Sequence, residues 1–284
     1  MFDVEPQTAS IGAEISSVTL KEIVSANDTA LHEELVSLLT RHKVLVFRDQ
    51  HPDPDTHVRL GRVLGELAPI HPLYPKVDSH QDIIIIRNDK DNPPENEVWH
   101  ADLSFHEAPG YAAILHGVEI PPAGGDTLWV DCEKIAADMS ASMLQFLGQL
   151  SAYHTMHKGF SFVKAGGQQA RSEAFDTVDH DANSAHHPVI RHHPISGAPC
   201  LFVNAAFTEK INELSSDESE MLLDYLCGLT HNPRYQFRLK WRPGTVAIWD
   251  NWSTQHFACG DHFPAKRQMQ RVTVSRAHEQ FLGA

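Results

Sequence analysis

The sequence predicts a mainly β protein with helical decoration, built as a β-sandwich or barrel. Short apolar runs rich in β-branched residues, such as 82–87, recur along the chain, and turn-forming residues such as those of 121–125 separate them. Strands do not alternate regularly with helices, as they would in a parallel α/β sheet. No glycine- and serine-rich linker and no internal repeat divides the 284 residues, so nothing in the sequence marks a domain boundary.

The expected elements follow in order along the chain. A stripe of leucines after Asn27 and Asp28, either of which can act as N-cap, predicts the first helix. Ser215, with Glu218 three residues later, resembles a capping box that starts a late helix. The polar stretch 168–187 is expected to be a mobile loop or lid. We expect helices over 27–42, after 53, over 133–147 and over 216–229, and strands over 43–48, 82–87, 112–116, 127–131, 235–241, 245–249 and 268–275.

Composition and charge exclude several classes of protein. The 23 basic and 37 acidic side chains give a net charge of −14, which argues against binding to nucleic acid. No window approaches the roughly 18 consecutive apolar residues of a membrane span, and the N-terminus lacks the regions of a signal peptide. The four cysteines form no C-x-x-C pair and are typical of buried thiols in a reducing compartment. We therefore expect an acidic cytoplasmic protein with neither a nucleic-acid nor a membrane partner.

The first chemically informative motif is W-H-A-D at 99–102. Residues i and i+2 of a strand point to one face, so His100 and Asp102 can converge on one metal ion. His256, which lies 256 − 102 = 154 residues after Asp102, would complete a set of two histidines and one carboxylate. Such a facial triad leaves coordination positions open and is typical of oxygen-activating non-haem Fe(II). Because the donors come from both halves of the chain, we expect one domain over 1–284.

A second group of histidines offers an alternative metal site. It consists of His186-His187 and His192-His193 and could hold zinc. Neighbouring residues of a strand point to opposite faces, however, and no cysteine or carboxylate completes the group. A structural or surface role is favoured for these four histidines.

Four blocks of sequence together resemble the taurine dioxygenase family of Fe(II)/2-oxoglutarate enzymes. They are W-H-A-D at 99–102, G-G-D-T-L-W at 124–129, W-D-N at 249–251 followed by His256, and Arg267. The resemblance covers about residues 10–276 and implies a double-stranded β-helix (jelly-roll) core, with His100, Asp102 and His256 as the catalytic Fe(II) ligands. It implies a 2-oxoglutarate-dependent dioxygenase that consumes O₂, releases succinate and CO₂, and hydroxylates a substrate C–H bond. It also implies a homo-oligomer, either a dimer or a tetramer.

Two arginines near the C-terminus suit the binding of anions. Arg267 and Arg271 share one face of the expected strand, with Cα atoms about 13 Å apart, which suits two anions that flank a metal. The resemblance implies that Arg267, helped by Thr127, binds the distal carboxylate of 2-oxoglutarate. The alternatives are a zinc hydrolase with the same triad and a metal-binding jelly-roll without turnover. Neither would use a clamp for a keto acid, so Arg267 and Thr127 favour the oxygenase.

The resemblance also implies a substrate, the sulfonate taurine. The sequence matches four positions that hold taurine in this family and two aromatic walls of its pocket: His71, Tyr74, Asn96 and Arg271, and Phe160 and Phe207. We predict hydroxylation of taurine beside sulfur, with release of sulfite and aminoacetaldehyde, in the service of sulfur metabolism. Other alkylsulfonates, sulfate esters and aryloxyalkanoates are the alternatives, because the metal motif does not distinguish among them.

Overall fold

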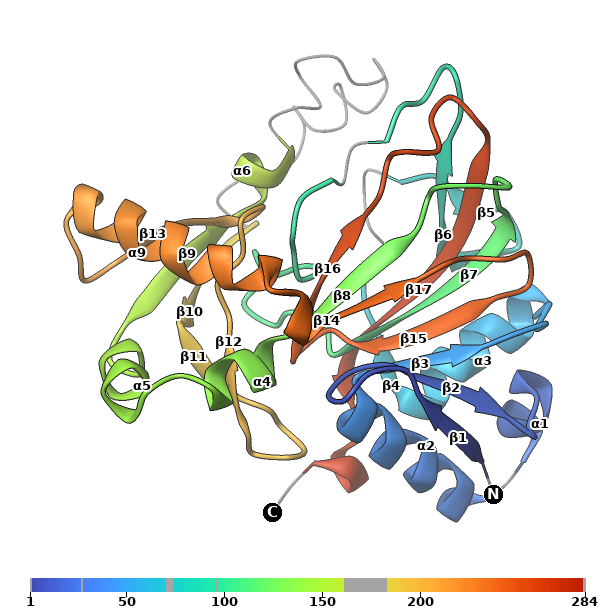
Figure 1. The fold of residues 1–284 in the computed structure, drawn as a ribbon. Helices are drawn as coiled ribbons and strands as arrows, with labels where there is room; N and C mark the ends of the chain where they lie inside the picture. The colour runs from blue at the N-terminus through green and yellow to red at the C-terminus, as the bar shows by residue number, and fades with distance from the viewer. Residues whose placement is uncertain (1, 27, 70–73, 95–96, 161–182, 283–284) are drawn as a thin grey trace.

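The computed structural model describes residues 2–26, 28–69, 74–94, 97–160 and 183–282. Two β-sheets lie face to face in it (Figure 1), which confirms the mainly β fold class and the jelly-roll core. The larger sheet has the strand order β1-β2-β3-β15-β7-β17-β6-β5, with β4 paired to β17, and the facing sheet has the order β14-β8-β16. Two smaller sheets, β10-β9-β13 and β11-β12, belong to the lobe that also carries helix α9.

The bounds of the elements are as follows. The larger sheet contains β1 (Asp3–Pro6), β2 (Ala13–Ser16), β3 (Val44–Phe47), β4 (Gly65–Leu67), β5 (Lys76–Val77), β6 (His80–Asn88), β7 (Ala112–Glu119), β15 (Val246–Asp250) and β17 (Arg267–Ala277). The facing sheet contains β8 (Thr127–Asp131), β14 (Gln236–Leu239) and β16 (Thr254–Ala258). The small sheets contain β9 (Ser151–Thr155), β10 (Ser184–Pro188), β11 (Ile190–His192), β12 (Pro199–Leu201) and β13 (Thr208–Ile211). The helices are α1 (Leu20–Ser25), α2 (Thr29–His42), α3 (Pro54–Leu64), α4 (Cys132–Ala137), α5 (Ala141–Leu147), α6 (Met156–Phe160) and α9 (Ser216–Gly228), with short 3₁₀ turns at Leu229–His231, Pro233–Tyr235 and Glu279–Phe281.

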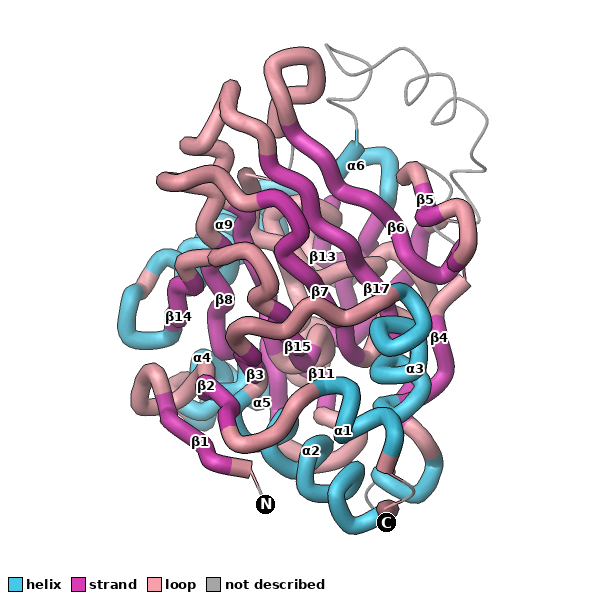
Figure 2. The backbone as a smooth tube through the Cα atoms, turned by 90° about the vertical axis from the view of Figure 1, so that its right-hand side faces the viewer, coloured by secondary structure: helices cyan, strands magenta, loops and turns pink. Residues whose placement is uncertain are grey.

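Large aromatic side chains fill the space between the two main sheets. The ring of Trp129 on β8 lies 5.8 Å from that of Trp249 on β15, measured between centroids, and both side chains are fully buried. On the opposite face of β15, Val246 and Ile248 pack in the core formed with α1, α2 and α3. Figure 2 shows β6, β17 and β7 side by side, with these three helices gathered at one end of the sheet. Because β15 is buried on both faces, its sequence is continuously apolar rather than alternating.

Most of the expected helices are confirmed, but the one expected over 133–147 is wrong in its extent. Asp28 caps α2 by accepting hydrogen bonds from the backbone N–H groups at its start, whereas Asn27 lies outside the described residues. The single helix expected over 133–147 is instead two helices, α4 and α5. Ser140 lies between them and accepts a hydrogen bond from the backbone N–H of Met143, so it caps a new helix rather than continuing the old one.

The expectation of a loop over 168–187 is wrong at its C-terminal end. Residues 184–187 belong to β10, which pairs with β9 along its whole length. Residues 168–182 of that stretch lie outside the described residues. Among the described residues, no helix combines the length and the apolar character that crossing a bilayer requires.

Two histidines are buried where α3 packs on β7. The ring centroids of His57 and His116 lie 6.2 Å apart, and burial lowers the pKa of each imidazole to about 4. Nε2 of His57 lies 3.2 Å from the carbonyl oxygen of Ile114, to which its N–H donates. Both rings are therefore neutral in the folded protein at pH 7.

Acidification should destabilise the fold through these two rings. Their pKa values in the unfolded chain are near 6.5, so between about pH 6.5 and 4 the unfolded state binds more protons. The free energy of unfolding should then fall by up to about 1.4 kcal/mol per pH unit for each ring. We expect His57→Gln to make the pH dependence shallower in denaturant titrations across this range. His192→Gln, at an exposed position of β11, is the control, and an equal change in both variants would contradict this origin.

Candidate metal and substrate site

Two histidines are brought together by a short backbone pairing at the edge of the smaller main sheet. The N–H of His100 donates to the carbonyl oxygen of His256 (3.0 Å), and the N–H of His256 donates to the carbonyl oxygen of His100 (2.8 Å). His256 lies on β16, the edge strand of that sheet, so the segment around His100 extends the sheet by one residue pair. The two imidazole centroids are 4.0 Å apart as a result.

Asp102 completes a buried group of three donors. The ligand atoms of His100, Asp102 and His256 all lie within 4.8 Å of one another, and each imidazole Nε2 is 4.0 Å from a carboxylate oxygen. Within the part of the chain that the structure describes, this is the one group of three or more such side chains placed to hold a metal ion. Two imidazole nitrogens and one carboxylate oxygen are the donor set of a non-haem Fe(II) centre.

The local backbone differs from the expected strand. His100 makes an isolated β-bridge, but Asp102 already lies in a turn, and the next residue, Leu103, has a left-handed φ of 58°. The side chains of His100 and Asp102 still converge, although the alternation of an extended strand is not the reason. Trp99, the residue before His100, packs in a core with Val130 and partly buried Phe257.

The protonation of the two histidines suits metal binding. Burial lowers the pKa of both imidazoles, most strongly for His256, so they are neutral, which is the form that binds a metal. Nδ1 of His100 lies 2.8 Å from the carbonyl oxygen of Val98. This contact requires the ring proton on Nδ1 and leaves the lone pair of Nε2 directed at the other two donors.

A buried arginine adjoins the three donors. Nη1 of Arg271, on β17, lies 2.8 and 2.9 Å from the two carboxylate oxygens of Asp102. Its Nε is buried and has no hydrogen-bond partner among the described residues. An orphaned buried donor of this kind is rare, and it fits an anionic oxygen from a ligand.

A second arginine lies four residues earlier on the same face of β17. Arg267 is 5% exposed, and its Nε donates to the carbonyl oxygen of Gly125 (3.1 Å). Gly125 has a φ of +71°, and a Cβ there would come within 3.0 Å of Cδ of Arg267, so glycine permits this approach. Thr127, two residues further on, is buried, and its Oγ1 accepts a hydrogen bond from Nε1 of Trp241. Burial lowers the pKa of Arg267 to about 10, and the guanidinium remains charged at neutral pH.

The structure describes some of the expected substrate residues and not others. The ring of Phe207 lies 6.1 Å from that of His100, and Tyr74 packs in the same apolar cluster as Phe207. His71 and Asn96 lie outside the described residues. Phe160 is the last residue of α6, and its side chain also lies outside what the structure describes.

A cavity of about 580 Å³ opens beside Arg271. Arg271, Thr273 and Ser275 alternate along the face of β17 that lines it, so the cavity follows this strand for about 13 Å. Arg271 is the one lysine or arginine among the described lining residues, which also include the acidic Asp82 and Glu107. Most of the remaining wall is apolar, with contributions from Ala68, Ile84, Leu103, Phe105, Ala108 and Met156.

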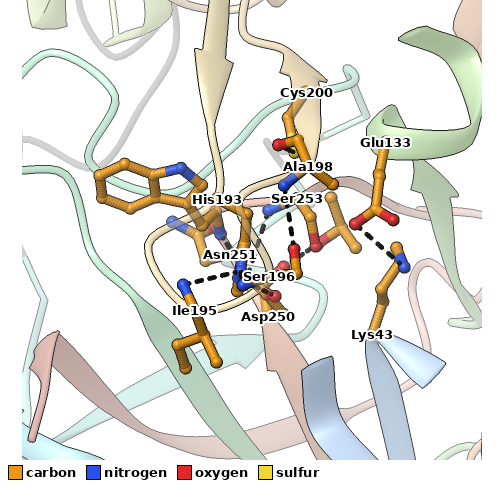
Figure 3. Close-up of polar contacts among 12 residues, drawn as sticks. Lys43, Glu133, His193, Ile195, Ser196, Ala198, Cys200, Asp250, Asn251 and Ser253 are labelled. Carbon is orange, nitrogen blue, oxygen red and sulfur yellow. Dashed lines mark hydrogen bonds and ion pairs between the residues drawn. The ribbon is translucent and has the colours of Figure 1, made fainter. Parts of the chain in front are cut away.

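Sequence reasoning missed the buried polar residues that support the site. Figure 3 shows His193 and Asp250, whose Nε2 and Oδ2 atoms are 2.7 Å apart. Nδ1 of His193 accepts hydrogen bonds from the backbone N–H groups of Ile195 and Ser196, so the ring proton lies on Nε2 and is donated to Asp250. Asp250 precedes Asn251, whose carboxamide bonds to the backbone of Asp102. The W-D-N block was recognised only as part of a signature, without a role for either polar residue.

Comparisons with known proteins agree with this geometry. Residues 3–273 match the family described as "Taurine catabolism dioxygenase TauD, TfdA family". An alpha-ketoglutarate-dependent sulfate ester dioxygenase of Pseudomonas putida is 33% identical over 96% of this chain and 89% of its own length. An alpha-ketoglutarate-dependent sulfonate dioxygenase of Saccharomyces cerevisiae is 32% identical over 95% of this chain and 66% of its own. The crystal structure of a taurine dioxygenase from Burkholderia xenovorans superposes with a TM-score of 0.80 at 30% identity, covering 96% of this chain and 89% of that one. The chain therefore belongs to the TauD/TfdA family and is an alpha-ketoglutarate-dependent dioxygenase.

Proposed function

We propose that His100, Asp102 and His256 bind Fe(II), and that this enzyme couples the oxidation of 2-oxoglutarate by O₂ to hydroxylation of an organosulfur anion. The observation that carries the proposal is the convergence of the three donors beside a buried arginine and a cavity. Fe(II) held there would supply open coordination positions for 2-oxoglutarate and O₂.

Arg267 and Thr127 are proposed to bind the distal carboxylate of 2-oxoglutarate. The guanidinium of Arg267 is buried, and its hydrogen bond to the Gly125 carbonyl fixes its orientation. Charge-assisted hydrogen bonds are strong where water is excluded, because the effective dielectric constant is low. A buried arginine offers a carboxylate two parallel N–H donors, which a lysine does not.

Arg271 is proposed to bind the sulfo group of the substrate. Because Arg271 donates to the Asp102 carboxylate, a sulfo group bound to Arg271, and the carbon next to that group, would lie directly beside the metal ligands. The orphaned Nε of Arg271 supports this role, because an anionic oxygen would satisfy it. Phe207, next to His100, would then form part of the wall around the reacting carbon.

The size and character of the cavity favour a substrate with an apolar chain. Taurine, which the sequence resemblance implies, has only two carbons and would leave most of the 580 Å³ unfilled. The cavity extends about 13 Å from Arg271 along β17, and its wall is largely apolar. We infer that an alkylsulfonate or alkyl sulfate ester is hydroxylated at the carbon next to the sulfo group, with taurine as the second candidate. Hydroxylation of taurine there would give an unstable product that releases sulfite and aminoacetaldehyde.

The metal assignment predicts that Asp102→Ala abolishes turnover and most of the Fe(II) or Co(II) binding, because one of three protein ligands is lost. The change also leaves Arg271 buried without its partner, at a cost of about 3–5 kcal/mol in stability, so folding is checked by circular dichroism. Asp102→Asn serves as the milder variant, and Glu209→Ala, at an exposed position of β13, is the control. Full turnover in Asp102→Ala would show that the ligand set is wrong, and turnover supported by Zn(II) would favour the hydrolase instead.

The proposed role of Arg267 predicts a loss of affinity for the cosubstrate. Arg267→Ala should weaken 2-oxoglutarate binding by about 2–5 kcal/mol, because a charged partner is removed from a buried anion site. Binding of Co(II) to the same variant should be unchanged, since Arg267 does not contact the three donors. Arg267→Lys keeps the charge but loses the two parallel N–H donors, so its affinity for 2-oxoglutarate should lie between those of the wild type and Arg267→Ala. Calorimetric titration measures all three, and undiminished 2-oxoglutarate affinity in Arg267→Ala would remove this arginine from the site.

The proposed apolar cavity predicts that narrowing it affects long substrates more than short ones. Ala68 lines the cavity, and its N–H donates to the carbonyl oxygen of Thr273, two residues beyond Arg271 on β17, so Ala68→Phe should fill the part of the cavity beyond Arg271. We expect kcat/KM for an octyl sulfate or octanesulfonate to fall at least tenfold, because the chain no longer fits, and that for taurine to change little. Ala123→Phe, in an exposed turn, is the matched control. Equal losses of kcat/KM on long and short substrates would contradict a substrate with an apolar chain. A preference of the wild type for taurine or a phenoxyacetate would contradict it as well.

A further inference from the structure

The side chain of Asn251 makes three hydrogen bonds to the backbone of Asp102 and Gly110. Its Oδ1 accepts from the N–H of Asp102 (2.8 Å), and its Nδ2 donates to the carbonyl oxygens of Asp102 and Gly110 (2.9 Å each). The residue is completely buried in the turn between β15 and β16. Both N–H groups of the amide are therefore donated and its oxygen accepts one hydrogen bond, so Asn251 has no free N–H donor to offer a ligand.

These bonds continue the pairing that joins the two histidines. In an antiparallel ladder, the hydrogen-bonded pair that follows His100 and His256 would be Asp102 and Thr254. That pair is not formed among the described residues, and Asp102 already lies in a turn. The carboxamide of Asn251 occupies the position of the missing partner, because it presents one acceptor and one donor to Asp102, as a facing peptide group would.

The chain leaves the antiparallel pairing directly after Asp102, so the backbone there needs the hydrogen bonds of Asn251. Leu103 has a φ of 58°, a left-handed conformation that a residue with a branched side chain adopts only at a cost. A left-handed residue reverses the course of the chain directly after Asp102. Without a fixed peptide before it, relaxation of Leu103 would rotate the Asp102 carboxylate away from the two imidazoles.

We propose that Asn251 is a positioning residue of the metal site, which acts through the backbone of Asp102 and contacts neither metal nor substrate. The inference rests on the proposed function of the three donors. It assigns to the asparagine of the W-D-N block a role distinct from that of Asp250, which pairs with His193 and with the backbone of the same turn.

The test compares metal affinity with stability in matched variants of the full chain. Co(II) binding to metal-free protein is measured by calorimetry, and thermal unfolding is followed without metal. Asn251→Ala removes all three bonds, and Asn251→Asp keeps the volume and the acceptor but replaces the donating nitrogen by an oxygen. Supporting residues around a metal site typically change its affinity 10–100-fold, so we expect the Kd for Co(II) to rise at least tenfold in both.

Thr254→Val, at the first residue of β16, is the control. The hydroxyl of Thr254 donates to the carbonyl oxygen of Asp250 (2.7 Å) and is buried, so the change removes one hydrogen bond without touching Asp102. We expect a lower melting temperature but a Co(II) Kd within twofold of the wild type. A purely structural role for Asn251 would give the same pattern in Asn251→Ala, and that result would overturn the proposal.

Other outcomes are equally decisive. Wild-type affinity in Asn251→Asp would show that the donated bonds are dispensable, and the proposal would fail. If Asn251→Ala does not fold, Asn251→Asp carries the test alone. Should Asp102→Ala itself bind Co(II) normally, the proposed metal site fails. Should Asp102→Ala lose the metal while the folded Asn251 variants keep it, only the positioning role fails.

Discussion

The antiparallel pair between His100 and His256 is the contact on which the candidate site depends. Two backbone hydrogen bonds join residues 256 − 100 = 156 positions apart and place their imidazoles 4.0 Å from each other. The pairing is possible because β16 ends its sheet and leaves backbone groups unpaired, a feature that otherwise invites aggregation. Residues on either side hold the pair in place: Trp99 lies before one histidine and Phe257 after the other, with ring centroids 5.7 Å apart. The two imidazoles are thus positioned by sheet formation and core packing.

Buried positively charged side chains lie at the candidate site, although the molecule as a whole is acidic. The chain carries a net charge of −14, yet two arginines are buried on one face of β17: Arg271 contacts the Asp102 carboxylate, and Arg267, four residues away, donates to the Gly125 carbonyl. Surface charges further away than about a Debye length of 8–10 Å are screened by salt, whereas buried charges are screened much less. Anion binding at the site therefore depends on the charged groups close to it, such as the Arg267 guanidinium, and does not require a basic surface.

The sequence predicted the parts of this protein that depend on residue type and periodicity. Strand β15 was expected from its apolar run, and the donor set from the chemistry of two histidines and an aspartate. Strand β10, with the sequence S-A-H-H-P, was missed because it has no β-branched residue, although Ala185 and His187 alternate inward as in any strand. Asn251 was missed for another reason. Its role depends on a left-handed Leu103 and on a gap in the ladder, and neither leaves a pattern in one sequence.

Strand β17 shows how strictly register constrains such a site. Arg267, Met269 and Arg271 point to the interior, where Met269 packs in the core between the sheets and the arginines approach the ligand sites. Further along the same face, Thr273 and Ser275 line the cavity, while Val272 and Val274 pack in hydrophobic clusters on the other side of the strand. A shift of one residue would move both arginines out of the site and place valines in the cavity. Such a shift is opposed because β17 pairs with β6, β7 and β4, so core packing and substrate recognition are determined by the same register.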